Sequence, residues 1–132
     1  NNSTEYIDTV RLNKFNQNYA EYQKIVNYAY DTVNQKPYVV FPKGEVSTVY
    51  YQGKINPKIA RQIFFCKETD EGKTFSCIYF LGYGRLPGSR GGVYYASDDK
   101  LFNAYMETRK EKYSGYIILE KIKPHWYFVT YT

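Results

Sequence analysis

The first long pattern of apolar and polar residues in the chain is helical and covers roughly residues 13–33. Apolar side chains recur there at alternating intervals of four and three positions, at Phe15, Tyr19, Tyr22, Val26, Ala29 and Val33. Asn, Gln, Glu and Lys fill the other positions, and neither Gly nor Pro interrupts the segment before Pro37. This pattern predicts one long amphipathic helix with a single apolar face.

After Pro37 the chain alternates short apolar runs with turn residues, which predicts strands. The expected strands cover residues 38–41, 46–51, 63–65, 78–81, 93–96, 101–106, 116–119 and 126–129. Residues 82–92 read as a glycine-rich loop, and residues 107–112 as a charged link between strands. We find neither an internal repeat nor a domain linker. We therefore expect one α+β domain over residues 1–132, with the long N-terminal helix packed on a twisted, mainly antiparallel sheet.

The two cysteines flank a segment with good hairpin chemistry. Gly72 in the centre of this segment tolerates positive φ, and apolar runs lie on both sides of it. A turn centred on Glu71 and Gly72 would place Cys66 directly opposite Cys77, whereas a bulge at Gly72 would offset them by one residue. We expect a cross-strand disulfide in the first register. The alternative is a pair of free, half-buried thiols.

Composition adds an aromatic bias and a mild positive charge. The chain holds 17 Tyr, 8 Phe and 1 Trp, which suits half-buried sheet positions first and stacking on bases or sugars second. The net charge of +5 favours an anionic partner such as RNA or an acidic protein. No stretch approaches the roughly 18 apolar residues of a membrane span, so we expect none.

Two basic segments are candidate binding elements. The glycine-rich loop carries Tyr83, Arg85 and Arg90, and the charged link carries Arg109, Lys110 and Lys112. The loop lacks the Gly-Lys-Ser/Thr ending of a phosphate-binding loop, so its arginines would have to contact an anion directly. The alternative is that both segments are solvated connectors. If an acidic partner or RNA binds, we expect these two segments to form the rim of the sheet face opposite the helix.

Catalytic and metal-binding signals are weak. His125 is the one histidine, and its place between Pro124 and Trp126 predicts an exposed turn. Asp98 and Asp99 are expected to form a hairpin turn rather than a catalytic carboxylate pair. Two cysteines separated by ten residues and one histidine do not supply the ligand pattern of a zinc site, and we expect neither metal nor cofactor.

The order of a helix followed by antiparallel strands resembles the small microbial ribonucleases of the barnase and fungal guanyl-preferring type. Residues 87–101 carry the resemblance, with a Gly-containing loop, an Arg-bearing strand and a tight polar turn. Residues 36–41 resemble the Tyr-Pro-containing start of the sheet in fungal members. The resemblance implies a ribonuclease-like fold.

The catalytic positions of such ribonucleases are not filled in this chain. The position of the Glu base falls near Cys77, Ile78 and Tyr79, and that of the Arg falls on Gly92, with Arg90 nearby. The position of the His acid falls in residues 106–113, which hold no histidine. General acid–base cleavage of RNA would therefore lack both partners, so we expect a fold that has lost the chemistry.

This chain, which is small and rich in Tyr, resembles the secreted ribonuclease-like effectors of powdery mildew fungi, which act inside plant cells. Residues 5–8 resemble their N-terminal Tyr-x-Cys motif, with Asp8 in place of the cysteine. The resemblance implies a secreted, non-catalytic, monomeric virulence effector that binds host protein or RNA. Two alternatives are an active nuclease toxin that works through Arg, Lys and Tyr without His, and an aromatic carbohydrate- or protein-interaction module.

Overall fold

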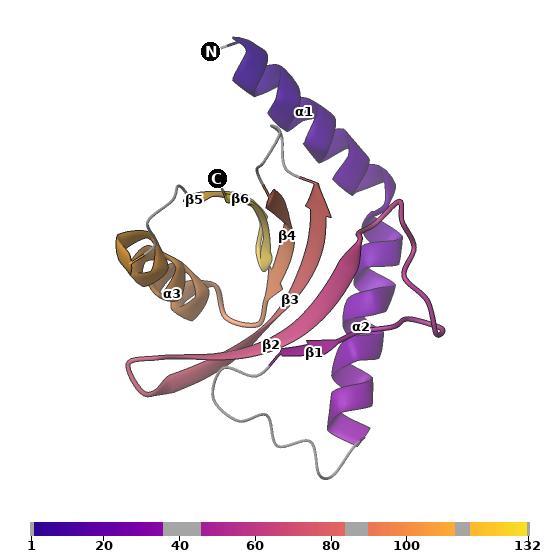
Figure 1. Ribbon diagram of the computed structural model, residues 1–132, viewed down its shortest axis with the longest axis vertical. Helices are drawn as coiled ribbons and strands as arrows, with labels where there is room; N and C mark the ends of the chain where they lie inside the picture. Colours follow the sequence, from indigo (N-terminus) through magenta and orange to yellow (C-terminus); the bar gives the residue numbers. More distant parts are fainter. Residues whose placement is uncertain (1, 36–45, 84–89, 113–116, 132) are drawn as a thin grey trace.

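The computed structural model describes residues 2–35, 46–83, 90–112 and 117–131. The helices in this part of the chain are α1 (Asn2–Gln17), α2 (Tyr19–Gln35) and α3 (Asp99–Lys112). The strands are β1 (Val46–Thr48), β2 (Gln62–Asp70), β3 (Lys73–Tyr83), β4 (Arg90–Ala96), β5 (Ile117–Lys123) and β6 (Trp126–Tyr131). They form one antiparallel sheet in the order β1-β2-β3-β4-β6-β5 (Figure 1). The α+β class and the antiparallel sheet are thus confirmed.

The prediction of one long N-terminal helix is wrong, because the helix is broken at Asn18. The Asn18 side-chain amide donates to the backbone carbonyl of Lys14 at 2.8 Å, and the backbone carbonyl of Asn18 accepts from the backbone N–H groups of Glu21 and Tyr22. A side chain that bonds the backbone in this way ends one helix while the next begins. Figure 1 shows α1 extending beyond the end of the sheet, while α2 lies along it.

The apolar face predicted for this region is the one that packs on the sheet. Phe15, Tyr22, Val26 and Ala29 are buried, together with Ile25, which the pattern did not include. The side chain of Val33 lies outside the described residues, as does the strand expected at residues 38–41. The helical spacing therefore identified the buried face correctly even where it missed the break.

The β2–β3 hairpin turns through Glu71 and Gly72, with φ values of 47° and 79°. Asp70 pairs with Lys73 on either side of this two-residue turn, and Cys66 then lies directly opposite Cys77. The expected register is confirmed. Both cysteines are buried free thiols, and a hydrogen bond with Cys66, together with burial, raises the pKa of the Cys77 thiol well above its usual range. The disulfide itself stays a prediction.

Residues 101–106 form part of helix α3 rather than the expected strand, so the predicted second hairpin is wrong. The Asp98 carboxylate accepts a hydrogen bond from the backbone of Leu101 at 2.9 Å and caps the helix. Phe102 and Met106, four residues apart, are both completely buried. A capping residue followed by apolar side chains at helical spacing explains why this segment leaves the sheet.

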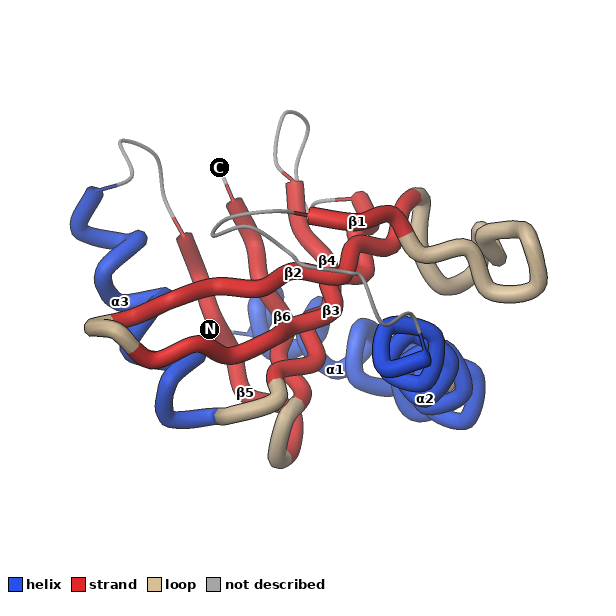
Figure 2. Tube along the Cα trace, turned by 90° about the horizontal axis from the view of Figure 1, so that it is seen from below, coloured by secondary structure: helices blue, strands red, loops and turns tan. Residues whose placement is uncertain are grey.

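Helix α3 covers the sheet face opposite α2, so the sheet is enclosed from both sides (Figure 1). One core cluster, beneath α2, includes Ile63, Phe65, Ile78, Phe80 and Trp126. The second, beneath α3, includes Phe75, Cys77, Tyr94, Tyr127 and Val129. Figure 2 shows the β2–β3 hairpin turned away from the direction of β4, β6 and β5, which gives the sheet a strong twist.

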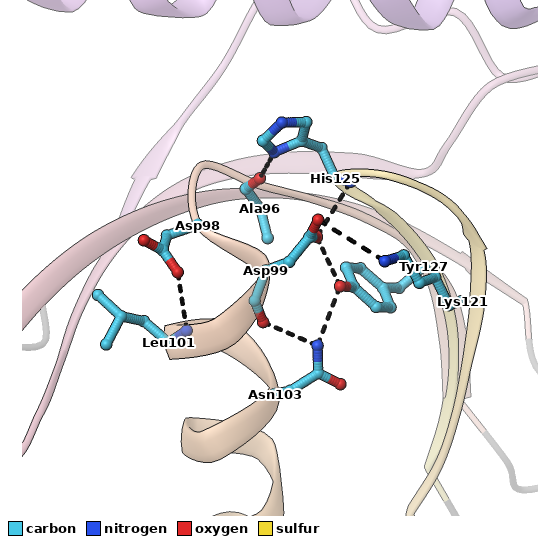
Figure 3. A network of polar contacts seen from close by, with 8 residues as sticks. All are labelled: Ala96, Asp98, Asp99, Leu101, Asn103, Lys121, His125 and Tyr127. Atoms are coloured by element: carbon cyan, nitrogen blue, oxygen red, sulfur yellow. Dashed lines mark hydrogen bonds and ion pairs between the residues drawn. The ribbon is translucent and has the colours of Figure 1, made fainter.

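A polar network ties the start of α3 to the turn between β5 and β6 (Figure 3). The Asp99 carboxylate accepts hydrogen bonds from the Tyr127 hydroxyl at 2.5 Å and from the His125 backbone at 3.0 Å. Lys121 lies 3.8 Å from the same carboxylate, and Asn103 donates to the Tyr127 hydroxyl at 3.0 Å. Asp98 and Asp99 therefore hold a helix terminus in place; the hairpin turn expected for them does not form.

Position 92 requires glycine. A Cβ added to Gly92 would overlap the carbonyl oxygen of Phe80 on the neighbouring strand, whereas one added to Gly82 would meet the carbonyl of Gly91 at an ordinary 3.7 Å. We predict that Gly92→Ala lowers the free energy of unfolding by about 3 kcal/mol or more, because two paired strands must separate. Gly82→Ala, the matched control, should change it by about 1 kcal/mol or less. Urea unfolding followed by circular dichroism measures both, and equal losses would contradict the prediction.

The Asp99 network predicts a loss of stability in acid. Partial burial by itself would raise the pKa of the Asp99 carboxyl, but hydrogen bonds from Tyr127 and His125 and the charge of Lys121 lower it below 3.8. The contribution of Asp99 is therefore complete above its ordinary pKa and disappears as the pH falls through the lowered value. Asp99→Asn should cost about 1–2 kcal/mol at neutral pH and flatten the acid limb of a melting-temperature profile. A profile as steep as that of the parent chain would contradict this role.

The opposed thiols predict a disulfide under oxidising conditions. The backbone N–H and C=O of Ser76 face away from β2 and bond Ser97. Because backbone groups alternate in direction along a strand, those of the next residue, Cys77, face β2, and Cys66 and Cys77 form a hydrogen-bonded pair. Such pairs place their Cα atoms about 5.5 Å apart, a separation that a disulfide spans. Refolding with oxidised glutathione should link Cys66 to Cys77 and add about 2–3 kcal/mol of stability. Peptide mapping without reductant detects the link, and recovery of two unlinked thiols would refute it.

Candidate functional site

A groove of about 380 Å³ lies on the α3 face of the sheet, next to the C-terminal turn of α3. Five elements contribute to it, namely β2, β3, β4, α3 and β6. The residues that line it are Gln62, Phe64, Tyr79, Leu81, Arg90, Arg109 and Tyr131. It combines aromatic rings with two guanidinium groups, and none of its described lining residues carries a carboxylate or an imidazole.

The floor of the groove comes from a row of aromatic residues that crosses the sheet. In the strand register Phe64 lies opposite Tyr79, Tyr79 opposite Tyr94, and Tyr94 opposite Tyr127. Phe102 of α3 packs on the inner two rings, with centroid distances of 5.1 Å to Tyr94 and 4.8 Å to Tyr127. The helix therefore covers one end of the row and leaves Phe64 and Tyr79 as the floor of the groove.

Arg109 reaches the groove from the last turn of α3. Its guanidinium carbon lies 5.7 Å from the centroid of the Tyr105 ring and 5.6 Å from that of Tyr131. Burial alone would lower the pKa of Arg109, but Tyr131, Tyr105, Tyr94 and Glu68 outweigh it and raise the pKa. The guanidinium is therefore charged at every physiological pH and is held by two aromatic rings.

Arg90 also lines the groove, and it is the first residue of β4. It is exposed, and the register places it opposite Tyr131 on β6. Within the described part of the chain, neither Arg90 nor Arg109 has a carboxylate oxygen within 4.0 Å. Two arginine side chains without a close ion pair among the described residues thus border an aromatic floor, although the more distant Glu68 acts electrostatically on Arg109.

Tyr79 lines this groove, and its hydroxyl is buried, yet that hydroxyl has no hydrogen-bond partner among the described residues. The Tyr79 ring stacks on Tyr94 with centroids 4.4 Å apart and planes inclined by 14°. Burial and the neighbouring Tyr131 raise the pKa of Tyr79, and the lowering effect of Arg90, Arg61 and Arg109 is smaller. The hydroxyl is therefore neutral at physiological pH and able to donate a hydrogen bond.

The structure brings together two of the residues expected from the sequence. Arg90 and Arg109 line the same groove, on the face opposite α2, as the sequence predicted for its two basic segments. Lys110 and Lys112 lie on α3 outside the lining, and Lys110 pairs with Glu107 at 3.1 Å. Arg85 and the side chain of Tyr83 lie outside the described residues.

Two details of the expected site are wrong. Residues 109–112 belong to a helix and not to a loop, and the sheet face opposite α2 is partly covered by that helix. Sequence analysis also missed Phe64, Tyr79 and Tyr131 as functional candidates. Alternation along β3 places Tyr79 on the same face as Cys77, but one tyrosine among 17 carries no signal that separates it from the others.

His125 does not form a catalytic pair with Asp99. The imidazole Nδ1 lies 2.6 Å from the Ala96 carbonyl oxygen, and the ring stacks on Tyr95 at a centroid distance of 5.3 Å. The Asp99 carboxylate bonds the backbone of His125 and not its ring, and Figure 3 shows the two groups pointing in different directions. The half-buried His125 is held as part of a turn with φ of 75°, contrary to the exposed position that was expected.

Searches within the described residues give two negative findings. No group of three or more His, Cys, Asp or Glu side chains there is arranged to hold a metal ion. None of the helices described there is long and apolar enough to cross a membrane.

Comparison with known proteins identifies no relative. No family model matches the chain, and neither a curated protein nor a solved structure is significantly similar to it. The ribonuclease-like resemblance therefore stays a prediction, and the function has to be argued from the groove.

Proposed function

We propose that this protein binds single-stranded RNA in the groove between Arg90 and Arg109, and does so without cleaving it. The observation that carries the proposal is the pair of arginines, without carboxylate partners among the described residues, on either side of an aromatic floor. Proteins that bind single-stranded nucleic acids combine these two features, since bases stack on aromatic rings while cations contact the backbone. A net charge of +5 favours the approach of a polyanion.

The size of the groove supports an unpaired strand. At about 380 Å³ it lies near the lower end of small-molecule sites, which run from roughly 300 to 1,000 Å³, and so suits about one nucleotide at a time. A base stacked within a duplex does not expose its face to such a site, whereas bases in single-stranded RNA are accessible. An acidic protein segment would satisfy the arginines but would leave the aromatic floor without a planar partner.

The absence of an acid–base pair in the lining supports binding without cleavage. The groove offers two arginines, a glutamine and tyrosines, and the pKa of Tyr79 is raised, which disfavours its use as a base. The described fold, with helix α2 on an antiparallel sheet, is compatible with a ribonuclease-like protein that has lost catalysis. Secretion and action inside a host cell remain part of the proposal through the effector resemblance alone.

The proposal predicts that the two groove arginines dominate RNA affinity. Arg90→Ala and Arg109→Ala should each weaken binding of a short unstructured RNA roughly tenfold, by removing a charged phosphate contact. Each should also reduce the slope of log affinity against log salt by about 0.7. Fluorescence anisotropy with a labelled oligonucleotide measures both quantities.

Lys112→Ala is the matched control, because it removes the same charge from the same helix outside the groove. It should change the affinity by about twofold or less, as a solvent-exposed charge without a direct phosphate contact does. Equal effects of Lys112→Ala and Arg109→Ala would mean diffuse charge attraction and no site at the groove.

The claim that the bound RNA is not cleaved needs a separate test. A gel of the RNA after incubation with the protein should show intact RNA. Cleavage that copurifies with the wild-type chain but not with the arginine variants would refute this claim.

A further inference from the structure

Tyr79 differs from its aromatic neighbours in the state of its hydroxyl group. On the same sheet face, the Tyr94 hydroxyl bonds the Tyr131 hydroxyl at 3.0 Å, and the Tyr127 hydroxyl bonds Asp99 and Asn103. The buried Tyr79 hydroxyl has no such partner in the described part of the chain. Burying a hydroxyl without a hydrogen bond destabilises a fold, and a phenylalanine would make the same ring stack on Tyr94 without that cost.

The surroundings of this hydroxyl restrict the chemistry of a partner. Tyr79 lines the groove together with Arg90 and Arg109, so three donors from β3, β4 and α3 border one space. Arg61 also acts on Tyr79 electrostatically with the same sign. An anion with more than one acceptor oxygen is the best match for a neutral phenol donor beside several guanidinium charges. A phosphate has acceptor oxygens pointing in several directions, which suits donors that converge from different elements.

We propose that the Tyr79 hydroxyl is a phosphate-binding group, which donates a hydrogen bond to a phosphate oxygen of the bound RNA beside Arg90 and Arg109. This inference rests on the proposed function and deepens it, because it names the part of the RNA that lies deepest in the groove. In the free protein the buried Tyr79 hydroxyl without a hydrogen bond lowers stability, and in the complex it supplies a donor to the phosphate. The bound base then stacks toward Phe64 and Tyr131 at the open side of the groove.

The test is a single-atom change, Tyr79→Phe, measured for stability and for binding in the full chain. Because the variant removes an unsatisfied hydroxyl and keeps the ring, its thermal midpoint should equal or exceed that of the parent chain. Its affinity for the short unstructured RNA should fall roughly tenfold, as the loss of a hydrogen bond to a charged group does. Loss of binding together with retained or increased stability is the signature of a ligand-binding role.

Tyr94→Phe is the matched control on the adjacent strand. It removes a hydroxyl that already has a partner in Tyr131, so its thermal midpoint should fall. A lower midpoint for Tyr79→Phe as well would show that the Tyr79 hydroxyl has a structural partner, and would overturn the inference.

A second probe separates phosphate from base contacts. The same oligonucleotide sequence made with uncharged methylphosphonate linkages should bind more weakly, and Tyr79→Phe should not weaken it further. An equal loss on both backbones would place the hydroxyl against a base or sugar and overturn the phosphate assignment. If Tyr79→Phe leaves RNA affinity unchanged while Arg90→Ala lowers it, this inference fails and the proposed function stands. If the parent chain does not bind the RNA, both fail.

Discussion

The packing of α3 on the second face of the sheet is the interaction on which the rest of this structure depends. Phe102 and Met106 are completely buried against that face, and the Asp98 cap and the Asp99 network hold the helix at its start. Without α3, Tyr94, Tyr127 and Val129 would be exposed to water. Because the helix ends before it covers the whole sheet, it also creates the groove and brings Arg109 to its edge.

The high tyrosine content follows from this two-sided burial. A sheet enclosed by helices on both faces needs large apolar rings, but many of these positions lie close to the surface, where a polar tip can find a partner. Tyr22, Tyr30, Tyr94 and Tyr127 each bond a carbonyl, hydroxyl or carboxylate. Tyrosine thus serves mainly as a structural residue here, and only a hydroxyl without a partner, such as that of Tyr79, is informative about a ligand.

The proposed role in recognition has an electrostatic basis. The polar groups of the described lining are cationic guanidiniums, a neutral amide and phenols, which are suited to neutralising an anion. The Asp99 carboxylate, which is bonded by the His125 backbone and lies near Lys121, is at the other end of α3 and supports the fold. The charge that stabilises the fold and the Arg109 charge at the groove are therefore placed at opposite ends of the same helix.

The sequence by itself determined the α+β class and the buried face of the N-terminal helical region, reduced the β2–β3 hairpin to two registers, and marked the basic segments that carry Arg90 and Arg109. These depend on local chemistry: the spacing of apolar residues, a Glu-Gly turn that tolerates positive φ, and charge in short segments. Only the tertiary structure decided that residues 101–106 are helical, because an apolar run this short fits a strand or a helix until its packing surface is known. It also decided which of 17 tyrosines borders the site, since that depends on where α3 ends over strands that are distant in sequence.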